Sequence, residues 1–416
     1  MENAKKNIVI AGAGFGGVTA ALILDKAFYR SQELRDAYQL IIINNHHSHL
    51  YTAALYEIAA IPQGHHKLDY IKSSITIPLA AIFHETHVDW REREITSIDR
   101  DKKLLTFDNT EELHYEYLIL ALGSETSYFN IPGAKEHSFA LKTFADGIKL
   151  RDRVQQLIES GDAEPLRIVI AGAGASGVEV AAEFENFICM LQKHQGKEAI
   201  CKTEVMLVEA TPEILPGFAP WIIEKAKKRL SHIGVQIKTG VAITAVEKDS
   251  VSLKDGTKLP FTVLVWAGGV QAASVLKTTG LALSPKGAVP VSDELETAPK
   301  VFAIGDNAAC MNPATQRPLP WNVPIAEHQA RTVAENIIAD LCGTSRQKFV
   351  PLKNYPFILA VGRKYAIADL VYIHEWGFTA WLLKLLVELK YLLSILPILE
   401  ALSTWWKYVS VARSND

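Results

Sequence analysis

The sequence predicts an α/β protein with an internal duplication, and three observations support this. The heptapeptide IVIAGAG occurs twice, at Ile8–Gly14 and at Ile168–Gly174. Each copy joins a short apolar run to a glycine-rich turn and a helical pattern. Two further apolar runs end in glycine at matching places in the two halves, Tyr117–Gly123 and Val263–Gly269. Together these features predict two Rossmann-like dinucleotide-binding domains, each built on a parallel sheet.

Both copies have the spacing Gly-x-Gly-x-x-Gly. The glycines are Gly12, Gly14 and Gly17 in the first copy and Gly172, Gly174 and Gly177 in the second. In this motif the first glycine allows a tight turn, the second lets the backbone approach a pyrophosphate, and the third lets the helix pack against the strand. The helix N-terminus offers free N–H groups and the positive end of its dipole to the phosphates. Two copies in the same context predict two bound dinucleotides.

The segment before each glycine-ended run is rich in charge and in turn signals, such as Asp108-Asn109 and Asp255-Gly256. This pattern predicts an antiparallel β-meander as the crossover before the last strand of each half.

Composition narrows the possible partners and ligands. Hydrophobic residues make up 49% and charged residues 21% of the 416 residues, as in ordinary folded proteins. The net charge of −3 argues against nucleic acid as a partner. The cysteines show no CxxC spacing, so neither a zinc site nor a disulfide scaffold is expected. Burial as small apolar residues explains the cysteines better than a role in sulfur chemistry does. They are Cys189, Cys201, Cys310 and Cys342.

The residue after the next strand indicates which dinucleotide each copy prefers. In the second copy the strand EVMLVE ends in Glu209, which would bond a ribose 2′-OH and repel a 2′-phosphate, favouring NADH over NADPH. The alternative is a solvated strand end. In the first copy YQLIIIN ends in Asn44, whose amide can also bond a ribose.

The stretch VFAIGDNAAC (Val301–Cys310) points to a flavin. An apolar strand that ends in Gly305-Asp306 is typical of FAD proteins near the ribityl chain, although Asp306 could instead be a helix N-cap. The first copy is therefore expected to hold FAD, with Gly123 among its contacts, and the second to hold NADH, with Gly268 among its contacts. A nicotinamide beside a flavin implies hydride transfer, and the cofactors supply that chemistry.

The sequence resembles the type II NADH:quinone oxidoreductases, which are single-subunit, non-pumping respiratory dehydrogenases with a glutathione-reductase-like fold. The resemblance covers nearly the whole chain, and its second and last motifs are the most specific. The motifs are GAGFGG (12–17), HLYTAALYEIA (49–59), ALGSET (121–126), GASGVEVAAE (174–183), VEATPEILPGF (208–218), FAIGDNAA (302–309) and GFTAWLLKLLVELKYL (377–392).

The resemblance implies further site residues. Glu179 is expected beside the nicotinamide and the flavin with a catalytic role, and the alternative is a first-turn acid that the helix dipole stabilises. Thr52 is expected among the FAD contacts.

The quinone pocket departs from the family pattern. The Ala-Gln pair of the family falls on Val323-Pro324 or on Ala326-Glu327, and neither contains the glutamine. Ala326, His328 and Gln329 are the candidate quinone contacts, although an ordinary helix start fits them equally well.

Three other functions remain open. A sulfide:quinone oxidoreductase has a similar fold but needs redox cysteines beside the flavin. The other two are a flavin-dependent NAD(P)H oxidoreductase with a different acceptor and a flavin redox sensor with slow turnover.

The C-terminal segment from Gly377 to Leu399 is long enough to cross a bilayer. However, each charge in its middle would cost about 2.5–3.5 kcal/mol at a membrane centre. Lys384, Glu388 and Tyr391 form one polar stripe, and leucines cover the rest of the helix. This pattern predicts an amphipathic helix that lies on the membrane.

Beyond Pro397 a second apolar stretch ends in Trp405-Trp406-Lys407-Tyr408, which is typical of headgroup level. A dimer interface or an ordinary core cap is the alternative. Because both repeats end earlier, the tail is expected to be removable without loss of FAD.

Four domain ranges are expected. They are 1–125 (FAD, first part), 126–267 (NADH), 268–345 (FAD, second part) and 346–416 (membrane docking). The expected protein is a peripheral membrane enzyme, at the cytoplasmic face if the source is bacterial, that passes electrons to a quinone. The sequence leaves open a homodimer.

Overall fold

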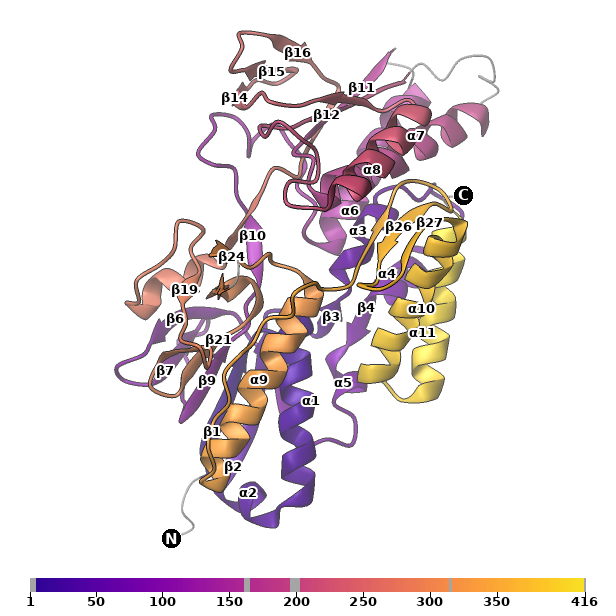
Figure 1. The fold of residues 1–416 in the computed structure, drawn as a ribbon. Coiled ribbons are helices and arrows are strands. Elements are labelled where there is room, and N and C mark those ends of the chain that lie inside the picture. Colours follow the sequence, from indigo (N-terminus) through magenta and orange to yellow (C-terminus); the bar gives the residue numbers. More distant parts are fainter. Residues whose placement is uncertain (1–4, 161–164, 195–202, 314–315, 415–416) are drawn as a thin grey trace. The chain divides into compact units, whose positions relative to one another are not determined.

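The computed structural model describes residues 5–160, 165–194, 203–313 and 316–414. These residues form two compact units (Figure 1). Unit 1 contains Met1–His49, Thr76–Glu125 and Val270–Tyr355, and unit 2 contains Leu50–Ile75, Thr126–Gly269 and Pro356–Asp416. The units group the expected ranges differently, because residues 50–75 and 356–416 pack with the second repeat.

Unit 1 is built on a six-stranded sheet in the order β20-β21-β9-β1-β2-β5. Its strands are β1 (Lys6–Ala11), β2 (Tyr38–Asn44), β5 (Val88–Glu92), β9 (Tyr117–Leu120), β20 (Glu296–Ala298) and β21 (Val301–Ala303). All neighbours pair in parallel except β20 and β21. The buried residues of the central strands β1, β2 and β9 are all apolar, as expected for a sheet that is covered on both faces.

Two long helices of unit 1 lie side by side, α1 (Phe15–Arg30) and α9 (Val323–Cys342) (Figure 1). The Asn322 side chain caps α9 by accepting from the Ile325 N–H, and Gly343 ends the helix with φ +68°. The shorter helices are α2 (Gln32–Ala37), α5 (Leu79–Ile82), η2 (Ser274–Thr279) and η3 (Gly305–Asn307).

Unit 2 is built on a four-stranded parallel sheet in the order β13-β12-β11-β17. Its strands are β11 (Leu166–Ala171), β12 (Thr203–Val208), β13 (Gln236–Lys238) and β17 (Val263–Trp266). The helices of this part are η1 (Thr52–Ala54), α3 (Leu55–Ile58), α4 (Leu68–Ile75), α6 (Phe144–Ser160), α7 (Ala175–His194) and α8 (Pro220–His232).

The predicted β-meanders are confirmed in both units. Each is a three-stranded antiparallel sheet that comes before the last parallel strand of its half. The strands are β6 (Ile95–Asp99), β7 (Leu104–Phe107) and β8 (Glu112–His114) in unit 1, and β14 (Ile243–Val246), β15 (Ser250–Leu253) and β16 (Lys258–Pro260) in unit 2. Short paired strands make up the rest: β3 (Ser48–Leu50), β4 (Thr76–Pro78), β10 (Ser124–Thr126), β18 (Val270–Ala272), β19 (Val289–Pro290), β22 (Ala308–Ala309), β23 (Met311–Asn312) and β24 (Arg317–Pro318).

The C-terminal part of unit 2 is an antiparallel sheet followed by a helical hairpin. The sheet contains β25 (Phe357–Ala360), β26 (Ala366–Asp369) and β27 (His374–Gly377), and the hairpin contains α10 (Phe378–Ile395) and α11 (Ile398–Arg413). The two helices lie side by side in Figure 1. No helix among the described residues is long and apolar enough to cross a membrane.

The hairpin belongs to the core of unit 2. Trp381, Leu385, Tyr408 and Val411 pack in one hydrophobic cluster with the 54–75 segment. This packing argues against the expectation that the tail can be removed without loss of FAD, because its helices contribute side chains to this core. The sequence hid this contact because the two partners lie more than 300 residues apart in the chain.

Candidate functional site

The glycine-rich loops have the same geometry in the two repeats. A Cβ on Gly12 would lie 2.3 Å from the Ala121 carbonyl oxygen, and a Cβ on Gly172 would lie 2.5 Å from that of Ala267. Both glycines have positive φ, +107° and +98°. A side chain at Gly12 or Gly172 would clash with the backbone of Ala121 or Ala267, so only glycine allows each loop to lie this close to the neighbouring chain.

The other glycines of the motif also match. A Cβ on Gly17 or Gly177 would lie about 2 Å from the carbonyl oxygen of Gly12 or Gly172 respectively, so both glycines allow close helix–loop packing. In contrast, nothing lies within 4 Å of a Cβ placed on Gly14 or Gly174. This open space at each helix N-terminus fits a pyrophosphate that binds the backbone N–H groups.

The predicted ribose residues touch the loops directly. Glu209 Oε2 accepts from the Ala173 N–H at 2.8 Å, and its Oε1 accepts from the N–H and hydroxyl of Thr211. Asn44 Oδ1 accepts from the Ala13 N–H at 3.1 Å, and its amide nitrogen donates to the His46 carbonyl at 2.8 Å. Glu209 is buried and is not the solvated strand end that was the alternative.

The turn predicted to face a ribityl chain is held by side chains that the sequence did not reveal. Ser124 Oγ donates to Asp306 Oδ2, which places Asp306 beside the 121–126 motif. Asn307 is fully buried, and its amide bonds the Leu122 N–H at 2.6 Å and the Gly123 carbonyl at 2.8 Å. No side chain caps η3, so Asp306 is not the helix N-cap that was the alternative. The sequence signal that could have identified Asn307 is its position as a polar residue directly after Gly305-Asp306.

The three candidate quinone residues occupy the first half of α9. Gln329 is buried, and its Oε1 accepts from the Gly305 N–H at 2.7 Å, so its side chain braces this turn. Ala326 lies close to Gly305. His328 Nδ1 lies 3.0 Å from the Tyr355 hydroxyl, and burial lowers the pKa of its imidazole.

Glu179 lies in the second turn of α7, because the helix begins at Ala175. The helix-dipole explanation therefore weakens, since that effect falls off within the first turn. Burial raises the pKa of the Glu179 carboxyl to about 8, against the opposing effects of Lys384 and of a hydrogen bond from the Ala360 backbone. The neighbouring Glu57 raises it further.

A buried charged cluster surrounds Lys384 in unit 2. Lys384 Nζ contacts Glu57 Oε1 and the Tyr408 hydroxyl, and it lies 3.5 Å from Glu388 Oε1. The Tyr408 hydroxyl donates to Glu57 Oε1 at 2.7 Å. Tyr56 also donates to this oxygen, at 3.1 Å.

The cluster contains more carboxyl groups than cations. Burial raises the pKa of Glu388 to about 8, although Lys384 opposes this shift. Interactions with Glu388 and Glu57 raise the pKa of Lys384 against the effect of burial, so the lysine stays charged. Burial therefore raises the pKa of two carboxyl groups in this part of unit 2, those of Glu388 and Glu179.

The polar stripe of α10 is confirmed, but it faces the protein. Lys384, Glu388 and Tyr391 are all at most 8% exposed. The apolar face is exposed instead, at Phe378, Leu382, Leu386, Val387 and Leu393 of α10 and at Ile398, Leu399, Leu402 and Trp406 of α11. Tyr408, predicted at headgroup level, is buried.

Two pockets lie outside the predicted site residues. One, of about 350 Å³ in unit 1, is lined by Trp90, Arg91, Glu92, Arg93, Phe107 and Glu111. It adjoins Asn44, whose carbonyl accepts from the Arg93 N–H at 2.9 Å, so it suits the adenosine end of a dinucleotide.

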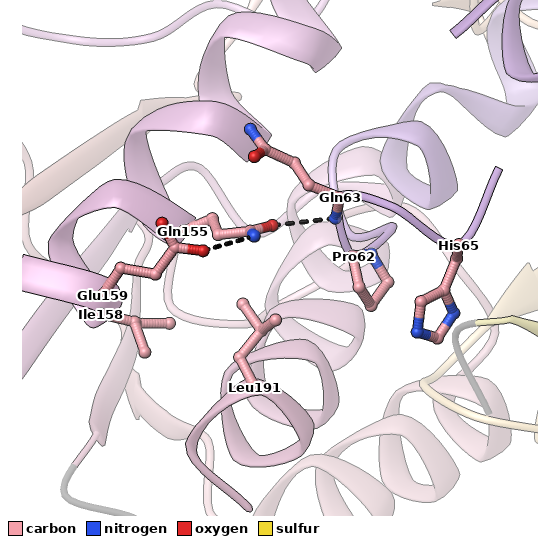
Figure 2. A pocket seen from close by; sticks show the side chains of 7 residues that line it. All are labelled: Pro62, Gln63, His65, Gln155, Ile158, Glu159 and Leu191. Atoms are coloured by element: carbon pink, nitrogen blue, oxygen red, sulfur yellow. Dashed lines mark hydrogen bonds between the residues drawn. The ribbon is translucent and has the colours of Figure 1, made fainter. Parts of the chain in front are cut away.

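The second pocket, of about 270 Å³ in unit 2, is shown in Figure 2. Gln155 links its two sides by bonding the Gln63 N–H and Glu159. The pocket is lined by Pro62, Gln63, His65, Gln155, Ile158, Glu159 and Leu191. It contains none of the predicted residues.

The remaining predicted residues lie as follows. Gly268 adjoins Gly172 at the second loop, whereas Thr52 is exposed in η1 of unit 2 and stays a prediction as an FAD contact. The cysteines differ from expectation, because Cys342 is exposed and Cys189 is disulfide-bonded, while Cys310 is half-buried. Cys201 lies outside the described residues. Within the described ranges no group of side chains could hold a metal ion.

Comparison with known proteins gives consistent matches. Residues 6–330 match the family model described as pyridine nucleotide-disulphide oxidoreductase. Demethylphylloquinone reductase NdbB from Synechocystis sp. is 28% identical over 400 residues, covering 94% of this chain and 93% of its own. Type II NADH:quinone oxidoreductase from Staphylococcus aureus is 28% identical over 360 residues, covering 84% and 86%. The structure of NDH2 from Plasmodium falciparum in complex with NADH has a similar fold, with a TM-score of 0.81, 17% identity and coverage of 97% and 98%.

Proposed function

Because the chain belongs to the pyridine nucleotide-disulphide oxidoreductase family, we propose that it is a non-pumping NADH:quinone oxidoreductase that uses FAD. The observation that carries this proposal is the pair of matching glycine cradles, one in each compact unit. The curated relatives, one named for NADH and quinone and one for demethylphylloquinone, support a quinone as acceptor.

The residues present fit both cofactors. The open space at Gly14, the turn at Gly305-Asp306 and the amide of Asn44 suit FAD, and those at Gly174 and Glu209 suit NADH. When bound, the two cofactors would supply the chemistry, hydride transfer from NADH to the flavin and electron transfer from the flavin to the quinone. The protein binds and orients these groups.

Glu209 sets the preference for NADH over NADPH. Its carboxylate is fixed by the Ala173 N–H and by Thr211, so it cannot swing away from a 2′-phosphate. The negative charges of the carboxylate and of a 2′-phosphate would repel each other strongly at this buried position.

Glu179 and the Lys384 cluster supply a proton. Quinone reduction consumes protons, and a carboxyl group with a pKa of about 8 holds one at neutral pH. Glu179, in the second turn of α7, is therefore assigned to proton transfer, and Lys384 on α10 lowers the pKa of its carboxyl group. Ala326, His328 and Gln329 remain the proposed quinone contacts.

The helical hairpin docks the enzyme on a membrane surface, at the cytoplasmic face if the source is bacterial. Its polar stripe faces the protein and its apolar face is exposed, which is the reverse of an ordinary surface helix in water. Apolar side chains such as Leu386, Leu399 and Trp406 would each contribute about 1.5–3 kcal/mol on leaving water.

The direct test is anaerobic titration of the purified full-length protein. The flavin absorbance should be lost on addition of NADH, to a far smaller extent with NADPH, and should return on addition of a lipophilic quinone. Sulfide-dependent bleaching would select the sulfide:quinone alternative. Reduction by NADH without reoxidation by any quinone would overturn the proposed acceptor and favour a redox sensor.

A further inference from the structure

In each glycine loop, the residue after the first glycine has both its backbone N–H and its backbone carbonyl held by hydrogen bonds. In the second repeat, the Ala173 N–H donates to Glu209 and the Ala173 carbonyl accepts from the Leu215 backbone N–H at 2.8 Å. In the first repeat, the Ala13 N–H donates to Asn44. The Ala13 carbonyl is bonded by a side chain instead, because His49 Nδ1 lies 2.9 Å from it.

His49 is suited to this contact. Its side chain has no exposed surface, and its ring meets the Phe15 ring edge to face with centroids 5.0 Å apart. A carbonyl oxygen can only accept, so His49 must carry its proton on Nδ1. Burial lowers the pKa of the imidazole to about 4, so the ring is neutral at physiological pH.

We infer that His49 is a positioning residue for FAD, which fixes the Gly12–Gly17 loop by donating from Nδ1 to the Ala13 carbonyl. This inference rests on the proposed function, in which the first loop binds the FAD pyrophosphate. Because the N–H and the carbonyl of Ala13 are both held, the following N–H groups of the loop stay aimed at the phosphates before FAD binds. The His49 imidazole donates to the alanine carbonyl of the first loop, as the Leu215 backbone N–H donates to that of the second loop.

The consequence is a specific loss of FAD affinity when the donor is removed. A buried carbonyl left without a partner is unfavourable, so the empty loop would relax until this carbonyl finds another donor. FAD binding would then have to restore the ordered loop. His49→Leu, which has no donor, should weaken FAD binding about 5- to 100-fold.

The test uses full-length apoprotein, with FAD binding followed by quenching of flavin fluorescence. His49→Asn places an amide nitrogen where Nδ1 lies, so it should restore FAD binding to within about threefold of the native protein. His87→Leu is the matched control, because this histidine bonds Asp25 at the far end of α1 and should not affect FAD. NADH binding to the same apoproteins should stay unchanged in all three variants, since the second loop has its own backbone donor.

A measurement on the native protein tests the inference even if a His49 variant does not fold. The ¹⁵N chemical shifts of labelled histidine report the tautomer, and His49 should be protonated at Nδ1. An Nε2-protonated ring would overturn the inference, as would equal FAD affinity in His49→Leu and the native protein. If His49→Asn loses as much affinity as His49→Leu, ring packing and not the hydrogen bond is responsible, and the inference also fails. Failure of the native protein to bind FAD would instead overturn the proposed function.

Discussion

At the scale of single residues, the two repeats use equivalent positions for different chemistry. Asn44 and Glu209 each accept from the alanine N–H inside their glycine loop, at 3.1 and 2.8 Å. Only Glu209 carries a charge, so only the second loop should discriminate against a 2′-phosphate. The difference between one amide and one carboxylate therefore separates the two binding sites.

Glu209→Gln should narrow the preference for NADH over NADPH about tenfold or more. Removing the charge relieves a repulsion worth about 1–4 kcal/mol between groups some 4 Å apart. Steady-state kcat/KM with each nucleotide measures the effect. Glu204→Gln is the control, because Glu204 lies on the same strand and pairs with Arg167 at a half-exposed site. Equal native rates with both nucleotides would contradict the assignment of Glu209.

Glu179→Gln should keep the FAD content but slow quinone-dependent turnover more than tenfold. Burial raises the pKa of Glu179 to about 8, so its proton is present below pH 8 and is lost as the pH rises above it. The native kcat should therefore fall above about pH 8, and the variant should lack this decline. Glu185→Gln on the same helix, where burial raises the pKa to about 7, is the control and should retain it. Full quinone-dependent activity in Glu179→Gln would mean that this residue has only a structural role.

At the scale of elements, α10 joins the tail to the 55–58 helix through the Lys384–Glu57 contact. The two residues are 327 positions apart in the sequence, and they meet in a buried site. A helical wheel can show that Lys384 and Glu388 share a stripe, but it cannot show which side of the helix meets solvent. The sequence therefore predicted the stripe and not its direction.

Lys384→Met should lower the thermal midpoint by several degrees. It leaves Glu57 buried without its cation, and breaking a buried pair costs about 3–5 kcal/mol. Adding Glu57→Gln should recover part of the loss, because the unpaired carboxylate is then removed. Lys390→Met, at an exposed site on the same helix, is the control. Calorimetry should show no change for this control, and an equal shift in both single variants would contradict a specific buried pair.

At the scale of the whole molecule, local patterns predicted more than long-range ones. Glycine spacing identified both loops, and turn signals identified both β-meanders, because each depends on residues close together in the chain. The packing of residues 50–75 with the C-terminal helices depends on distant partners, and no periodicity reports that. The sequence also did not predict that Asn307 and Gln329 hold the Gly305 turn, because their hydrogen-bond partners are distant in the chain.

Truncation before Gly377 should damage unit 2. It removes Trp381 and Tyr408 from a shared hydrophobic cluster and uncovers the apolar faces of α3 and α4. The truncated protein should aggregate or lose NADH binding, which limited proteolysis and NADH fluorescence would show. A monomeric truncated protein with native NADH affinity would mean that the hairpin is a separable anchor.

Substitution of the exposed face separates membrane docking from core filling without this damage. Leu386→Ser, Leu399→Ser and Trp406→Ser together remove side chains that are 55%, 81% and 65% exposed, so the fold should survive with its FAD. Binding to lipid vesicles should weaken at least a hundredfold, because each side chain contributes about 1.5–3 kcal/mol when it leaves water. Dye reduction by NADH should persist while activity with a lipophilic quinone in vesicles falls. The matched control is Val350→Ser with Leu352→Ser, two exposed apolar residues of unit 1 that should leave vesicle binding intact. Unchanged cosedimentation of the triple variant with vesicles would mean that this face packs against protein, as in a dimer. The molar mass from light scattering would then show whether that partner is a second copy of the chain.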